Sequence, residues 1–168
     1  NGRSTLLEVS ITSTDSGVNW TARASAGARW WEGLASSADG SKLVAVTFND
    51  QIYTSTDSGV TWAAHDSARA WSAVASSADG SKLVAAEYGG QIYTSTDSGT
   101  TWNARESTRN WAGVASSADG SRLVAAHYGG QLYTSPGDRT TLGTAGTLSG
   151  AQFDVITLQY QGGGLFMP

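Results

Sequence analysis

A segment of forty residues occurs repeatedly in this 168-residue chain. Residues 31–70 and 71–110 are identical at most aligned positions, and residues 111–135 match the first part of the same segment. The chain also opens with the second half of a copy, in residues 10–30, called here the half copy. Because units of this size stack on their neighbours, the repeat restricts the possible folds more than composition does.

Each copy contains four short β-like runs separated by turn signals. In the middle copy these runs predict strand A over residues 71–77, strand B over 82–88, strand C over 91–96 and strand D over 100–105. No segment has an apolar period of 3.6 residues, which excludes helical repeats. Several runs are apolar on both faces, as expected for sheets stacked between neighbours. Four strands in about forty residues is the period of a β-propeller blade.

An eight-residue motif, Ser-x-Asp-x-Gly-x-Thr-Trp, lies between strands C and D. It occurs at residues 55–62 and 95–102, and at 13–20 with Asn in place of Thr. We expect the Asp to accept backbone N–H groups, the Gly to take a positive φ and the Trp to pack over the hairpin. The motif residues interpreted as structural are Asp15, Gly17, Trp20, Asp57, Gly59, Trp62, Asp97, Gly99 and Trp102.

These motifs give residues 10–135 a resemblance to the Asp-box (BNR) repeat propellers, which include sialidases, photosystem II assembly-factor-like proteins and many secreted bacterial proteins. The resemblance implies an all-β, β-propeller-type array of four-stranded antiparallel blades. It also implies that the Asp box is a structural hairpin, away from the binding face. Complete propellers of this family hold more blades than the roughly three found here, and the fourth motif position, residues 135–140, lacks its Trp.

Two domain segments are therefore predicted. Residues 1–135 form the repeat blades, and residues 136–168 form a Gly/Thr-rich segment with a terminal β-hairpin, packed on the same domain. Three blades leave sheet edges and apolar faces open. Three completions remain: the hairpin joins the half copy as a fourth blade, several chains combine their blades, or the chain is a fragment of a longer array.

The loops differ in how well they repeat. The A–B and C–D turns are nearly invariant among the copies, whereas the B–C loops and the D–A linkers vary. Since binding loops diverge while scaffold turns repeat, the B–C/D–A edge is the candidate binding face. Its candidate ligand-binding residues are Arg29, Arg69, Arg109, Trp30, Glu87, Tyr88, His127 and Tyr128.

The three arginines lie forty residues apart, each two residues before a strand-A Trp. In the functional interpretation they surround a shallow depression that binds an anion or a sugar. In the structural interpretation each Arg stacks on an aromatic ring or pairs with Asp66 or Glu106.

Composition excludes several classes of function. A net charge of −4 provides no basic stripe for nucleic acid, and no apolar run is long enough for membrane insertion. The chain has no Cys, and His65 and His127 do not have metal-ligand spacing, so no metal and no cofactor are expected. Glu87 and Tyr88 are residue types of a sialidase site, but that family's N-terminal Arg-Ile-Pro-type motif is absent. No catalytic residue is predicted.

The leading functional hypothesis is a non-catalytic, secreted or cell-surface binding or scaffold module. Its partner is a glycan or further copies of itself, as a homo-oligomer or filament. The alternative is an assembly factor that binds a protein partner, and the second alternative is a sialidase-like glycoside hydrolase.

Overall fold

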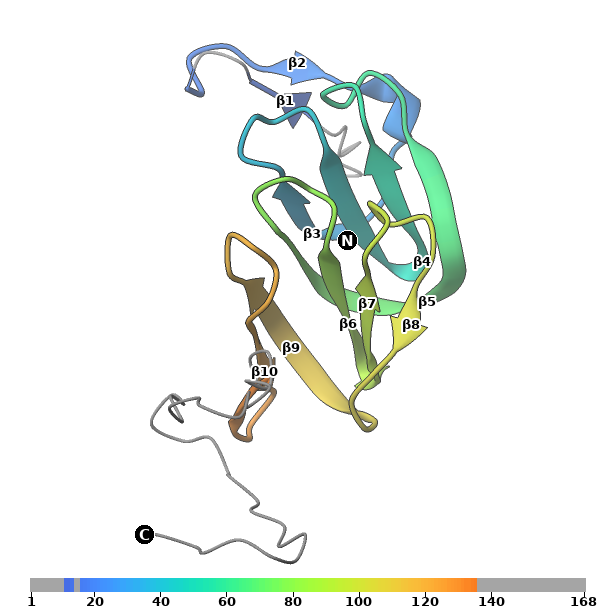
Figure 1. The fold of residues 1–168 in the computed structure, drawn as a ribbon. Helices are drawn as coiled ribbons and strands as arrows, with labels where there is room; N and C mark the ends of the chain where they lie inside the picture. Colours follow the sequence, from blue (N-terminus) through green and yellow to red (C-terminus); the bar gives the residue numbers. More distant parts are fainter. Residues whose placement is uncertain (1–10, 14–15, 136–168) are drawn as a thin grey trace, which may run out of the picture. The chain divides into compact units, whose positions relative to one another are not determined.

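The computed structural model describes residues 11–13 and 16–135 (Figure 1). The chain divides into two compact units, residues 1–135 and residues 136–168. The predicted C-terminal hairpin belongs to the second unit and lies outside the described residues, as does Asp15 of the first motif.

The described residues form antiparallel β-strands and a single turn of 3₁₀-helix, Ala24–Ala26, and none of their helices is long and apolar enough to cross a membrane. The strands are β1 (Ile11–Thr12), β2 (Thr21–Ala22), β3 (Trp31–Ser36), β4 (Leu43–Ser55), β5 (Ala63–Ser76), β6 (Leu83–Gly90), β7 (Ile92–Ser95), β8 (Asn103–Ala104), β9 (Arg109–Ser116), β10 (Leu123–His127) and β11 (Leu132–Thr134).

The second copy forms the four-stranded antiparallel unit that the sequence predicts. Its strands A to D are the end of β5, then β6, β7 and β8, and each pairs with the next. The register places Val74 opposite Ala85, and Ala85 opposite Tyr93. Strand A of the first copy is β3, and strands A, B and C of the third copy are β9, β10 and β11.

Two strands are longer than predicted. β4 continues through the expected B–C loop at residues 47–50, and β5 continues through the expected D–A linker at residues 66–70. The physical reason is that these two segments pair with each other, Phe48 with Ala70 and Asp50 with Arg69. β6 and β9 pair in the same way, so the copies are joined into one sheet in the order β11-β10-β9-β6-β5-β4-β3, with β7 and β8 attached at β6.

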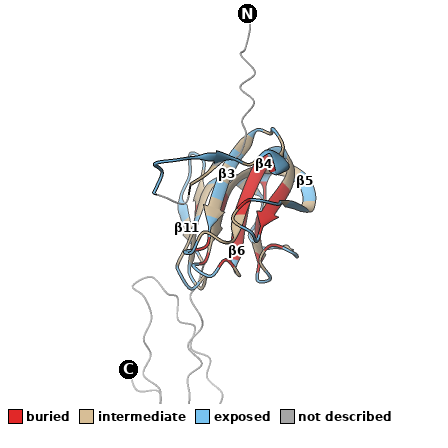
Figure 2. Ribbon diagram, turned by 90° about the horizontal axis from the view of Figure 1, so that it is seen from above, coloured by how far each residue is buried: buried red, intermediate tan, exposed pale blue. Residues whose placement is uncertain are grey.

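The core lies between consecutive copies. At the first junction, between copies one and two, Val46 and Ile52 pack against Trp71, Leu83 and Ala85. At the second junction, Val84, Ala86 and Ile92 pack against Trp111 and Ala125. Alternate residues of β6 therefore serve opposite junctions, which explains why this strand is apolar on both faces. Figure 2 shows the buried residues concentrated along β4 and β6.

The half copy occupies the place of strands C and D of a preceding repeat. A Cβ built on Gly59 would lie 3.1 Å from Thr12 Cγ2, and one on Gly99 would lie 2.7 Å from the corresponding atom of Thr54. The hairpin of β1 and β2 is thus positioned on the first copy as strands C and D of the first copy are positioned on the second.

Candidate functional site

The Asp-box hairpin is held by side-chain hydrogen bonds within the motif. In the second copy the Asp97 carboxylate accepts the Thr101 backbone N–H at 2.9 Å and the Thr101 hydroxyl at 2.6 Å. The Ser95 hydroxyl accepts the Gly99 N–H at 2.9 Å, and the Trp102 indole N–H donates to the Gly99 carbonyl at 2.9 Å. The first copy repeats these contacts. The motif therefore builds a turn, as the structural interpretation predicts.

The carboxylates of both repeated turns have low pKa values. Hydrogen bonds from Thr61 and Thr101 lower the pKa of Asp57 and Asp97 to about 2, with a smaller contribution from the preceding Ser. In the A–B turns, hydrogen bonds from the Ser two residues earlier and the Ser two residues later lower the pKa of Asp39 to about 2 and hold the pKa of Asp79 and Asp119 far below the usual range. Hydrogen bonding to the charged form is the cause in every case.

These shifts predict loss of stability in acid. Each group has a folded-state pKa below its unfolded value of 3.8, so its contribution is complete above about pH 4 and is lost as the pH falls towards 2. We expect the thermal midpoint, followed by circular dichroism, to fall between pH 5 and pH 2. Asp97→Asn keeps the shape but removes one titrating group, so its midpoint should fall less steeply. Equal slopes for both proteins would contradict this assignment.

Each of the three predicted arginines stacks on the strand-C tyrosine of the copy that follows it. The guanidinium carbon lies 4.3 Å from the ring centroid for Arg29 over Tyr53, and 4.6 Å for Arg69 over Tyr93. For Arg109 over Tyr133 the distance is 4.7 Å. These are stacking contacts of the kind that the structural interpretation of the arginine row describes.

In the first two copies an acid completes the Arg–Tyr pair, but it comes from different positions. The Asp50 carboxylate lies 2.7 Å from Arg29 and accepts the Tyr53 hydroxyl at 3.2 Å. In the second copy the Glu87 carboxylate takes this place, 3.2 Å from the Tyr93 hydroxyl and 3.8 Å from Arg69. Burial raises the pKa of both tyrosines.

Glycine makes the exchange possible. Asp50 corresponds to Gly90 in the second copy, where a Cβ would lie 2.2 Å from the Glu87 carboxyl carbon. In the first copy Thr47 occupies the position of Glu87. Its smaller side chain leaves the space beside the tyrosine free for the Asp50 carboxylate. The acid is thus supplied from one position or the other, and never from both.

The third copy has no such acid among the described residues. His127 stands in place of Glu87 and packs on Trp111, with ring centroids 6.3 Å apart. Arg109 has no carboxylate within ion-pair distance in residues 11–13 and 16–135. The predicted pair with Asp66 is present for Arg69, at 3.7 Å. The corresponding Arg109–Glu106 pair is not formed, since Glu106 accepts hydrogen bonds from Ser107 instead.

Four aromatic side chains are exposed on the B–C/D–A edge. Trp30 is 75% exposed, Tyr128 70%, Tyr88 45% and Phe48 41%. The last three occupy the same position of the B–C loop in the three copies. Phe48 is absent from the sequence-derived candidates, although its spacing of forty residues from Tyr88 identifies it. We call these four residues the aromatic edge.

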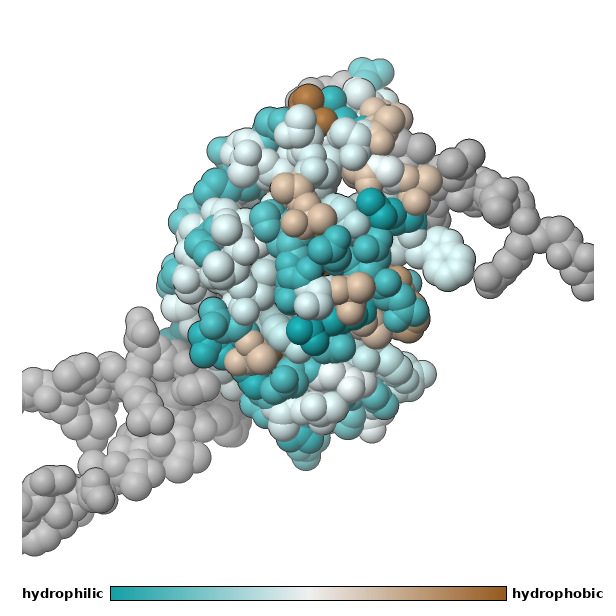
Figure 3. Space-filling model, turned by 90° about the vertical axis from the view of Figure 1, so that its right-hand side faces the viewer, coloured by the Kyte–Doolittle hydropathy of each residue, from teal (hydrophilic) through white to brown (hydrophobic). Residues whose placement is uncertain are grey.

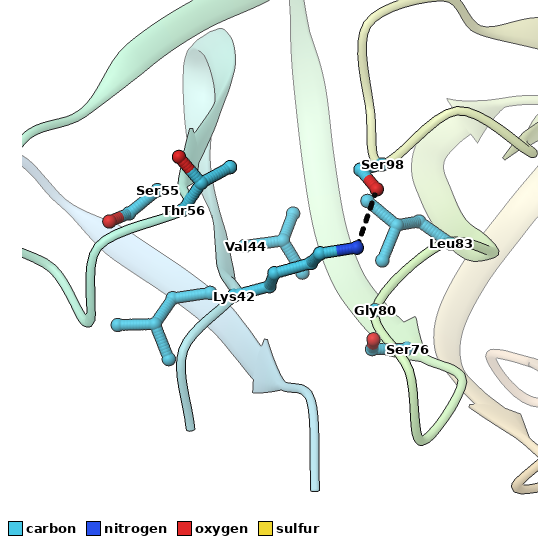
Figure 4. Close-up of a pocket in the computed structure, with 9 residues that line it drawn as sticks. Lys42, Val44, Ser55, Thr56, Ser76, Gly80, Leu83 and Ser98 are labelled. Carbon is cyan, nitrogen blue, oxygen red and sulfur yellow. Dashed lines mark hydrogen bonds between the residues drawn. The ribbon is translucent and has the colours of Figure 1, made fainter. Parts of the chain in front are cut away.

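A pocket lies at the opposite edge, among the invariant A–B and C–D turns of the first two copies (Figure 4). Lys42 lies across it and donates to the Ser98 hydroxyl at 3.2 Å. The pocket holds little more than a water molecule. It is not the predicted depression around the arginines. Within the described part of the chain, His, Asp and Glu side chains form no group of three that would hold a metal ion.

No protein-family model matches the chain, and no curated protein matches it in sequence. Solved structures do match. The GH74 enzyme of Niastella koreensis is 31% identical, over 62% of this chain and 16% of that chain, with a TM-score of 0.50. YCF48 bound to D1 peptide is 14% identical, over 64% of this chain and 38% of that chain, with a TM-score of 0.55. YCF48 from Cyanidioschyzon merolae is 16% identical, over 62% of this chain and 33% of that chain, with a TM-score of 0.54.

The fold is β-propeller-like. The chain spans well under half the length of each of these structures, and the two YCF48 structures establish the fold alone at their level of identity. Membership of the Asp-box family remains a prediction.

Proposed function

We propose that this chain is a non-catalytic β-propeller-type scaffold that binds a protein partner on its aromatic edge. The observation that carries the proposal is the exposed aromatic ring at the same B–C loop position in all three copies: Phe48, Tyr88 and Tyr128. One exposed ring at the same position of every copy makes this edge the candidate contact surface, because exposed apolar side chains gathered on one surface mark interaction sites.

The edge is a rigid platform. The loops that carry Phe48 and Tyr88 pair with the D–A linkers, through Ala70 and Asn110 respectively. Tyr128 is held by a hydrogen bond from its backbone N–H to the Asn110 carbonyl at 2.8 Å. A loop whose backbone is already ordered loses little conformational entropy on binding, and Tyr and Trp dominate the energetics of protein interfaces.

Charge distribution supports an acidic group on the partner. Arg29 and Arg69 form ion pairs with Asp50 and Glu87, whereas Arg109 forms no ion pair with the described residues and has Glu106 only as a more distant acid. A partner carboxylate near Arg109 would complete the arrangement that the first two copies already contain. The likeness to a YCF48 structure that holds a peptide also favours a protein partner.

A catalytic role is not favoured by the same contacts. A sialidase-like site needs several arginines on one substrate carboxylate, but Arg29 and Arg69 are each stacked on a different tyrosine and paired with a different acid. Glu87 is bonded to Tyr93 and not to the neighbouring Tyr88, whose ring is exposed. We therefore propose a binding function, in an array of about three blades, at an extracellular or cell-surface location.

A peptide-display library selected on the purified chain tests this proposal, since a protein-binding edge should enrich a consensus of apolar residues flanked by an acid. The triple variant Phe48→Ala, Tyr88→Ala, Tyr128→Ala should bind the selected peptide at least tenfold more weakly, because each such ring contributes about 1–2 kcal/mol. The control is Val60→Ser, an exposed apolar residue on the opposite edge.

The same protein on a glycan array distinguishes the competing class. Specific glycan binding that the triple variant loses, with no enriched peptide, would replace the proposal by a lectin. Peptide binding that survives in the triple variant would assign the site elsewhere.

A further inference from the structure

The two junctions within the chain are built by the same contacts. The backbone N–H of Ala38 donates to the Ala78 carbonyl at 2.7 Å, and that of Ala78 donates to the Ala118 carbonyl at 2.7 Å. A Cβ on Gly80 would lie 2.8 Å from the Lys42 side chain, and one on Gly120 would lie 2.7 Å from that of Lys82. Each copy therefore has a front face that receives the preceding copy and a rear face that docks on the next.

The rear face of the third copy has the same residues but no following copy among residues 11–13 and 16–135. Val124 of β10 is only partly buried, while the corresponding Val44 and Val84 are buried. Nothing described lies within 4 Å of a Cβ on Gly113, whereas one on the corresponding Gly33 would lie 3.3 Å from Ala73. Arg122 corresponds to Lys42 and Lys82, whose side chains lie over Gly80 and Gly120 of the next copy.

The front face of the first copy is open in the complementary places. Leu34 is 77% exposed, while the corresponding Val74 is 8% exposed within the first junction. No described atom lies within 4 Å of a Cβ on Gly40, although its counterparts Gly80 and Gly120 are each covered by a lysine stem. These open positions are the ones that strands A and B of a preceding copy would cover. The positions of strands C and D are already occupied by β1 and β2 of the half copy.

We propose that a second molecule of this chain docks head to tail on the first. Strands β9 and β10 of one molecule then pack against the front face of the first repeat copy of the other molecule, beside its β1 and β2. Leu34 then lies over Gly113, Arg122 lies over Gly40, and the Ala118 N–H donates to the Ala38 carbonyl. These contacts repeat, residue for residue, those of the two internal junctions.

The shared unit has two strands from each molecule. β9 and β10 supply strands A and B, and the half copy supplies strands C and D. β1 and β11 correspond to the same strand C, so only one of them pairs with β10, and β11 is a three-residue edge strand. Its displacement gives up the β10–β11 pairing and the contacts of Tyr133 with Arg109 and Trp111. β1 replaces the lost strand pairing, and docking buries both open apolar faces.

Light scattering on the full chain tests the proposal with two single variants. Leu34→Glu places a charge on the front face and Gly113→Glu places one on the rear face, and both positions are open in the folded chain. We expect the wild type to associate as its concentration rises and each variant alone to remain monomeric. An equimolar mixture of the two variants should give a heterodimer, because one intact junction remains between them.

Tyr128→Glu is the matched control. It places the same charge on the aromatic edge at a similarly exposed residue and should leave the association unchanged, while it weakens any peptide bound there. Failure of self-association and failure of peptide binding are thus separate results.

A wild type that stays monomeric at every concentration would overturn the proposal and assign the open faces to the chain's own terminal segments. Association that both glutamate variants retain, or that Tyr128→Glu abolishes, would also overturn it.

Discussion

Replacement of Trp71 by alanine is expected to destabilise the repeat unit by about 3–5 kcal/mol, the usual cost of removing a buried Trp. Trp71 is fully buried at the first junction, where it packs edge-on against Tyr93 with ring centroids 5.1 Å apart. Domains of this size are stable by only about 5–15 kcal/mol, so the variant should lose a large part of its folding free energy. The measurement is urea unfolding followed by far-ultraviolet circular dichroism.

Trp30→Ala is the control for this prediction, because it removes the same type of side chain from a position that is largely in solvent. Its change in unfolding free energy should stay within about 0.5 kcal/mol. Similar losses for the two variants would mean that Trp30 belongs to the core and that the aromatic edge is wrongly drawn.

Gly99→Ala is expected to cost about 2–5 kcal/mol, from two separate effects. Gly99 has a φ of +88°, a conformation that costs an L-residue about 1–2 kcal/mol. Its Cβ would also lie 2.7 Å from Thr54 and 3.1 Å from Leu83, and such overpacking adds about 1–3 kcal/mol. The tight fit arises because the hairpin of one copy presses on the preceding copy.

Gly129→Ala separates the two effects. Gly129 has a φ of +69° but no described atom within 4 Å of a Cβ, so only the backbone cost applies. Chemical denaturation of both variants should give Gly99→Ala the larger loss by at least about 1 kcal/mol. Equal losses would show that the Asp-box hairpin does not press on its neighbour as closely as the structure indicates.

Much of the fold follows from the repeat alone. Residues 71–105 predict four antiparallel strands, and the structure forms them with Asp97 accepting a backbone N–H as expected. These features depend on neighbours within one repeat, where turn chemistry and apolar pattern decide the conformation locally. The sequence left two interpretations of the arginines open, and the structure shows each arginine stacked on a tyrosine ring.

The site is less predictable, because its residues interact across repeat positions that the alignment treats as independent. Comparison of the copies shows Thr47 and Asp50 in one and Glu87 and Gly90 in another, without indicating that the two carboxylates fill the same space. It also gives no reason to expect that the loops at residues 47–50 and 66–70 pair and extend β4 and β5.

The forty-residue repeat by itself determined the strand order, the Ser-x-Asp-x-Gly turns and the presence of two unlike edges on every copy, since these depend on local pattern. Only the tertiary structure decided which of the repeated apolar residues are buried. Ile52 and Leu132 hold equivalent positions in sequence, yet one is buried and the other is exposed. Burial depends on whether another copy is stacked against the face, and that is a property of the assembled array and not of the repeat.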